Sequence, residues 1–93
     1  MKAINKEYLE RVAHLMKDRR VALSFKQSEA AARSGINLRT LQRFEQTGEI
    51  NFDTLLRLMV LYRMDKRVVA AIEDRAWWTI EELERAETKR TVR

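Results

Sequence analysis

The sequence contains no cysteine and no proline, and each absence excludes a class of structure. Without cysteine the chain can form neither a disulfide scaffold nor a cysteine-based metal site, which suits a reducing compartment. Without proline, and with two glycines among 93 residues, few positions interrupt a helix. Because 45% of the residues are hydrophobic and no alternating strand pattern competes, we expect an all-α chain with short connections.

Long apolar runs and catalytic side chains are scarce as well. No stretch approaches the ~20 apolar residues of a membrane span, and the opening MKAINKEYLE lacks the apolar region of a signal peptide. The single histidine, His14, has no pattern of further metal ligands around it, and there is no glycine-rich phosphate loop. We therefore expect a cytoplasmic protein with no membrane contact, no enzymatic activity, no metal and no cofactor.

The charge of the chain is positive and unevenly distributed. Nineteen Lys and Arg against fourteen Asp and Glu give +5, which favours association with polyanions. Residues 1–50 hold ten basic and six acidic side chains (+4), whereas residues 51–93 hold nine and eight (+1). A nucleic-acid surface is therefore expected in the first half of the chain.

Apolar residues at helical spacing predict six helices. The first begins after Asn5 as N-cap and runs to about Ser24, and the next three cover about 27–34, 38–46 and 52–63. A fifth opens at Asp65 as N-cap, and a sixth covers about 80–89 before a frayed basic tail, 89–93. The candidate core residues are Tyr8, Leu9, Val12, Leu15, Met16, Leu23, Phe52, Leu55, Leu56, Leu58, Met59, Leu61, Met64, Val68, Val69 and Ile72.

The segment from Phe25 to Glu45 reads as two short helices joined by a tight turn, a helix-turn-helix. Gly35 has no Cβ, so the first helix of the pair can end there in a left-handed conformation, and Ile36 tucks back under the turn. Asn37 follows as a good N-cap for the second helix.

The second helix of this pair has two different sides. Projection at the helical period places Leu41 and Phe44 on one side. The other side carries Arg39, Gln42, Arg43 and Gln46. Arg and Gln side chains on an outward face are suited to reading base edges, and the guanidinium of Arg39 matches O6 and N7 of guanine. A phosphate contact is the alternative for Arg39.

This segment closely resembles the lambda-repressor-like, Cro-type helix-turn-helix domains of the XRE family. The resemblance is carried by the stretch Phe25 to Glu29, by Ala31 and Gly35, and by the run Leu38 to Glu45, and it covers roughly residues 10–75. It implies a five-helix DNA-binding domain, to which this chain adds a C-terminal helix. Two departures from the family pattern are Lys26, where a capping Ser or Thr is common, and Glu49, where many relatives carry Lys or Arg.

The resemblance also implies roles for individual residues. It implies that Gln27 touches DNA phosphate and that Thr40 contacts the DNA backbone. It further implies that Arg20 and Glu45 form an internal ion pair. The full set expected at base edges is Leu38, Arg39, Gln42 and Arg43, and the set expected at the DNA backbone is Lys26, Gln27, Asn37, Thr40 and Gln46.

Less specific interpretations of the same segment stay open. The pair could be an amphipathic helical hairpin whose Arg and Gln face is merely solvated, or a helix-turn-helix used for protein contact alone. Leu38, at the edge of the outward face, packs on a thymine methyl or completes the core, with the core favoured.

The C-terminal residues lie outside the resemblance. We divide the chain into a helix-turn-helix domain, 1–76, and an extension, 77–93. Thr79 followed three residues later by Glu82 is a capping-box signature for the last helix. Trp77, Trp78, Ile80 and Leu83 are expected to form a dimer seam or to contact a partner. The alternative is a tail that folds back over the first and fifth helices.

The sequence thus favours a sequence-specific regulator of transcription. We expect a homodimeric repressor that reads a palindromic operator in double-stranded DNA, with the helix at 38–46 in the major groove. A second hypothesis is an antitoxin that autorepresses its operon and binds a toxin through the acidic segment 79–88.

Overall fold

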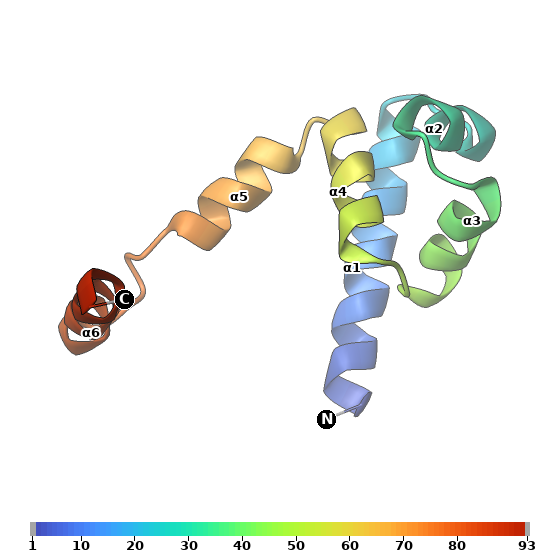
Figure 1. Ribbon diagram of the computed structural model, residues 1–93. Coiled ribbons are helices and arrows are strands. Elements are labelled where there is room, and N and C mark those ends of the chain that lie inside the picture. Colours follow the sequence, from blue (N-terminus) through green and yellow to red (C-terminus); the bar gives the residue numbers. More distant parts are fainter. Residues whose placement is uncertain (1, 93) are drawn as a thin grey trace.

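The computed structural model describes the backbone of residues 2–92 and the side chains of residues 5–89. Within this range the regular structure is helical and contains no strands, which confirms the all-α part of the prediction. The helices are α1 (Lys2–Ala22), α2 (Gln27–Ser34), α3 (Leu38–Thr47), α4 (Phe52–Leu61), α5 (Asp65–Glu73) and α6 (Ile80–Val92), as Figure 1 shows. None of the helices in the described part is long and apolar enough to cross a membrane.

Several predicted helix ends differ from the structure. Asn5 is not an N-cap, because α1 already begins at Lys2 and Asn5 lies inside its first two turns. Asp65 occupies the first turn of α5, and Met64 is the residue before it. The tail predicted from Lys89 onward is helical through Val92, and Arg93 lies outside the described residues. The bounds predicted for α2 are confirmed.

The core lies among α1, α2, α3 and the end of α4. Two alanines, Ala30 and Ala31, are almost fully buried and let α2 approach its neighbours closely. The remaining buried apolar side chains are Ala13, Met16, Leu41, Phe44, Leu58, Met59 and Tyr62. The predicted burial of Met16, Leu41, Phe44, Leu58 and Met59 is confirmed.

Other predicted core residues lie at the surface. On α1, Tyr8 is 59% exposed and Leu15 62% exposed, because the neighbouring helices cover only the side of α1 that carries Ala13 and Met16. Phe52, at the start of α4, is 63% exposed. The remaining core predictions that are wrong in this sense are Leu9, Val12, Val69 and Ile72.

The last two helices, α5 and α6, extend away from the rest of the molecule. We call α1 to α4 the body and residues 65–92, with α5 and α6, the arm. Figure 1 shows the arm extending away from the body, so the structure does not have the alternative arrangement, a tail folded back over α1. The radius of gyration is 16.6 Å, whereas a compact domain of this length would have about 12 Å. Apart from Val68 of α5, which packs against the edge of the core, the arm is therefore an uncovered extension.

Candidate nucleic-acid interface

The turn between α2 and α3 has the conformation that its sequence predicts. Gly35 adopts a left-handed conformation with φ 71° and ψ 31°. The N–H of Gly35 donates to the Ala32 carbonyl (3.3 Å), and that of Ile36 donates to the Ala31 carbonyl (3.0 Å). These bonds satisfy carbonyls that the end of a helix otherwise leaves free. Ile36 is half-buried and packs against the core, as predicted.

The start of α3 is capped by Asn37. Its side-chain oxygen accepts a hydrogen bond from the backbone N–H of Arg39 at 2.7 Å. This confirms Asn37 as N-cap. Since its oxygen is occupied by this bond, Asn37 fixes the position of α3 at its first turn, where a contact to DNA is expected.

The start of α2 is held in a different way. Lys26 precedes the helix and its exposed side chain makes no capping bond, because an ammonium group has no acceptor. Instead, the carboxylate of Glu29 accepts from the Lys26 backbone N–H at 3.2 Å. The Lys26 charge is therefore left in solvent beside the start of α2.

One face of α3 is open to solvent. Leu41 and Phe44 are each 1% exposed and hold the opposite face against the body. The exposed side chains include Arg39, Gln42, Arg43 and Gln46, the four that the helical projection places on the outward side, and also Leu38. Leu38 is 39% exposed, so the preference for a core position was wrong.

The two arginines on this face have different surroundings. Arg43 forms an ion pair with Glu49 at 2.7 Å, and both side chains remain largely exposed. Thr47 links the two residues, because its hydroxyl donates to the Arg43 carbonyl (2.8 Å) and accepts from the Glu49 N–H (3.1 Å). Among the described residues none forms an ion pair with Arg39. Unlike Arg43, Arg39 would therefore not have to break an ion pair before it contacts another molecule.

A buried ion pair joins α1 and α3 behind the open face. The guanidinium of Arg20, on α1, makes two bonds to the carboxylate of Glu45, on α3, at 2.7 and 3.0 Å. The Arg20 side chain is 9% exposed and that of Glu45 is 4% exposed. The hydrogen bond to Glu45 raises the pKa of Arg20. This confirms the ion pair that the family resemblance implies.

Gln27, at the start of α2, joins the same cluster. Its side-chain amide donates to Glu45 at 2.9 Å, and the residue is half-buried. An amide has two N–H groups and a carbonyl oxygen, so this bond leaves Gln27 donor and acceptor capacity. Thr40, another of the residues expected at the DNA backbone, is also half-buried.

Contacts that the sequence did not reveal fix the two ends of α3. Gly48 adopts φ 81° directly after the helix, and a Cβ built on it would lie 2.5 Å from the Leu9 carbonyl oxygen on α1. Near the turn before α3, Arg57 of α4 donates to the Gly35 carbonyl at 3.5 Å and pairs with Asp53 at 3.3 Å. Sequence spacing could not find the approach of Gly48 to Leu9 or the bond from Arg57 to Gly35, because each of these two contacts joins segments far apart in the chain.

Comparison with family models, with curated proteins and with solved structures finds no match to this chain. In the described part of the chain no group of three His, Cys, Asp or Glu side chains is placed to hold a metal ion. The chemistry that the site offers is that of its own side chains: guanidinium and amide donors on an exposed helix face, held by a buried ion pair.

Proposed function

We propose that this protein is a sequence-specific DNA-binding regulator of transcription, a homodimeric repressor whose α3 enters the major groove. In this proposal α2 and α3 form a helix-turn-helix of the lambda-repressor-like, XRE type. The single observation that carries it is the open face of α3, where Arg39, Gln42 and Arg43 stand exposed. A helix fits the major groove, where each base pair presents its own pattern of donors and acceptors.

The buried cluster behind α3 supports the proposal on physical grounds. Base reading requires side chains held in register, and α3 is joined to α1 and α2 through Arg20, Glu45 and Gln27. A well-placed bidentate contact contributes about 1–3 kcal/mol of discrimination between bases. Because the Arg20–Glu45 pair is buried, DNA does not compete for it, and α3 enters the groove as a preformed element.

The contacts to the DNA backbone follow from the start of α2 and α3. Lys26 supplies a charge, and Gln27 and Thr40 supply donors, while Gln46 lies at the far end of α3. Such contacts position the protein without reading sequence. Arg43 exchanges its exposed bond to Glu49 for a bond to DNA, which costs little because exposed ion pairs contribute about 0–1 kcal/mol.

The proposal is tested by fluorescence anisotropy with the DNA upstream of the gene and with a scrambled duplex at several salt concentrations. We expect at least a roughly hundredfold preference for the native sequence and an affinity that falls steeply with salt. Equal weak binding to both duplexes would contradict the proposal, because the net charge of +5 alone accounts for it.

Arg39→Ala makes the test specific to the open face. The preference for the native duplex should fall about 5-fold to 150-fold, which corresponds to the loss of about 1–3 kcal/mol. The matched control is Arg67→Ala, since Arg67 is exposed on α5 and its removal changes the net charge by the same amount. An unchanged preference in Arg39→Ala would remove Arg39 from the base-reading set.

A second candidate function, an antitoxin, is favoured by the uncovered arm. Trp77 is 75% exposed and Ile80 74% exposed, as expected for a segment that binds another protein. In that case the protein would co-purify with a toxin encoded beside it, and removal of the arm would abolish neutralisation while DNA binding persists.

A further inference from the structure

The arm exposes large apolar side chains that nothing in the same chain covers. No residue of α5 is buried, and Ile72, Trp77 and Ile80 are 67%, 75% and 74% exposed. Isolated helices of 9 and 13 residues are marginal in water. The arm therefore requires a surface that covers these side chains.

The turn between α5 and α6 holds Trp77 outward. The Asp74 carboxylate accepts from the Ala76 N–H (2.9 Å), and the Trp78 N–H donates to the Arg75 carbonyl (3.0 Å). The Arg75 guanidinium lies over the Trp78 ring at 4.8 Å, and the Trp77 ring meets Trp78 edge to face at 5.9 Å. Trp78 is half-buried by these contacts, so Trp77 is presented on an ordered turn.

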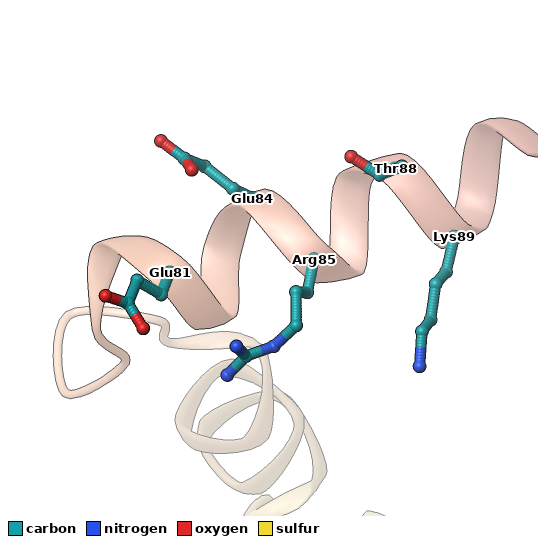
Figure 2. Close-up of a pocket in the computed structure, with 5 residues that line it drawn as sticks. All are labelled: Glu81, Glu84, Arg85, Thr88 and Lys89. Atoms are coloured by element: carbon teal, nitrogen blue, oxygen red, sulfur yellow. The ribbon is translucent and has the colours of Figure 1, made fainter.

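The start of α6 is also ordered. The N–H of Thr79 donates to the Glu82 carboxylate (2.8 Å), and the N–H of Glu82 donates to the Thr79 hydroxyl (3.1 Å), which confirms the predicted capping box. The hydrogen bond from the Thr79 backbone lowers the pKa of Glu82. Figure 2 shows Arg85 and Lys89 extending from one side of α6 and Glu84 from another. The pocket on α6 is lined by Glu81, Glu84, Arg85, Thr88 and Lys89. Because most of these side chains are charged, this pocket does not suit an apolar group.

A matching apolar groove lies on the body between α1 and the start of α4. Its volume is about 280 Å³, and its lining is formed by Tyr8, Leu9, Val12, Phe44, Gly48, Ile50, Phe52 and Leu55. This volume is below the roughly 300–1,000 Å³ of small-molecule sites. Pockets of this kind accept a large anchoring side chain of a protein partner, with Trp among the preferred types.

The arm of the same chain does not reach this groove. The α4–α5 turn is fixed by the left-handed Arg63 (φ 60°), by the Met64 N–H donating to the Met59 carbonyl (2.8 Å), and by Arg19 donating to the Tyr62 carbonyl (3.0 Å). This turn sets the direction of α5, which leads away from α1 and from the beginning of α4 (Figure 1). The arm of the same chain therefore leaves the groove open.

We propose that two copies of the chain exchange arms, so that Trp77 and Ile80 of each copy enter the α1–α4 groove of the other. Each chain carries one arm and one groove, and a reciprocal exchange fills both in both copies and closes the assembly. The inference rests on the homodimer of the proposed function and is independent of DNA binding.

The available area is sufficient for a stable pair. From their exposed fractions, the arm side chains offer on the order of 500 Å² and the groove side chains on the order of 400 Å². If all of this area were covered, two such contacts would bury on the order of 1,800 Å², within the roughly 1,200–2,000 Å² of stable interfaces.

The charges of the two surfaces are also complementary. Residues 79–88 hold four Glu and one Arg, a net charge of −3, whereas residues 2–22 of α1 hold six basic and three acidic side chains, a net charge of +3. Without Arg20, whose charge Glu45 matches, α1 still carries +2. Opposite charges favour the encounter of arm and groove and disfavour contact between two arms.

The test is analytical ultracentrifugation of full-length variants over a range of concentrations. We expect Trp77→Ala, on the arm, and Phe52→Ala, in the groove, each to raise the dimer Kd at least tenfold. Leu15→Ala is the matched control, because Leu15 is 62% exposed on α1 and lies outside the groove lining. A wild-type protein that stays monomeric at all concentrations would overturn the proposal. Weakening by Trp77→Ala but not by Phe52→Ala would also overturn it, in favour of arm-to-arm contact.

A mixing experiment separates the two arrangements again. A chain that ends at residue 75 keeps the whole core cluster, since its members and the residues packed on it lie between Ala13 and Val68. Arm exchange predicts that this chain binds the full-length chain through its groove but does not pair with itself. Absence of the mixed pair would overturn the exchange. Anisotropy on DNA is scored separately, so a dimer without specific DNA binding leaves the exchange intact and contradicts the proposed function.

Discussion

At the scale of single residues, Gly48 combines a left-handed backbone with a close approach of two helices. Its φ is 81°, and an added Cβ would lie 2.5 Å from the Leu9 carbonyl oxygen. Gly35 is also left-handed, but the nearest atom to its added Cβ is the flexible Arg57 Nη1 at 3.9 Å. A substitution at Gly35 therefore measures the energetic cost of the left-handed backbone alone, whereas one at Gly48 measures that cost together with the cost of the clash with α1.

We predict that Gly48→Ala lowers the free energy of unfolding by more than about 2 kcal/mol. The left-handed conformation costs about 1–2 kcal/mol for a residue with a Cβ, and the clash with α1 adds to it. Gly35→Ala should cost only the conformational part. Urea unfolding followed by circular dichroism measures both variants. Equal losses would show that α1 moves away from Gly48 without penalty.

The buried hydroxyl of Tyr62 should make the stability of the fold depend on pH in the alkaline range. Its side chain is 1% exposed, and burial raises the pKa of Tyr62 to about 12, whereas an unfolded chain has about 10. Between these values the folded protein keeps the proton that the unfolded chain loses. Stability that is fully present below pH ~10 is therefore lost as the pH rises toward ~12, by about 1.4 kcal/mol per unit.

Tyr62→Phe should remove this dependence. Near pH 7 the variant should be as stable as the wild type or slightly more stable, because the Tyr62 hydroxyl has no hydrogen-bond partner among the described residues. At pH 11 the variant should be the more stable protein by about 1.4 kcal/mol. The measurement is the difference in urea midpoints at the two pH values. Parallel curves for both proteins would contradict the assignment to Tyr62.

At the scale of helices, the contact that matters most to the candidate interface is the one between α1 and α3. Glu45→Ala would leave Arg20 buried without its partner, and we predict a loss of about 3–5 kcal/mol in the free energy of unfolding. The control is Glu10→Ala, which removes an exposed pair with Lys6 at 4.0 Å and should cost less than about 1 kcal/mol. Thermal and urea unfolding of both variants check this. Similar small losses would show that Arg20 finds water or another acceptor.

The helices that could be predicted from sequence are those whose ends carry local signals. Gly35 ends α2 and Asn37 begins α3 through bonds within a few residues, so pattern alone located them. The outward face of α3 followed from the period of Leu41 and Phe44 in the same way. The prediction of Asn5 as N-cap was wrong because the residues around a good capping residue do not show whether a helix has already begun before it.

The sequence does not show which apolar stripes are covered by another helix. The helix α1 has 21 residues and α3 has 10, so at 1.5 Å per residue α1 is about twice as long as its neighbour. The stripe around Tyr8 and Val12 therefore extends beyond the part of α1 that is covered, and periodicity alone cannot show this. The pairing of Arg43 with Glu49 likewise depends on the conformation of a loop.

At the scale of the whole molecule, the body and the arm differ in what stabilises them. The body has its own core, whereas the described side chains of α6 include none that is buried, and α5 has none either. Dimerisation through the arm would therefore add stability by mass action rather than through the core of one chain.

We predict that the melting temperature of the full-length protein rises with protein concentration, while that of the chain ending at residue 75 does not. A dimer unfolds into two chains, so a higher concentration favours the folded pair, whereas unfolding of a monomeric body is independent of concentration. At low concentration the two melting temperatures should converge, because the full-length chain then unfolds as a monomer with the same core. Calorimetry over a hundredfold range of concentration tests this. A melting temperature of the full-length protein that does not change would mean that the arm contributes nothing to the folded assembly, and a shortened chain that shows the same rise would locate the dimer contact in the body.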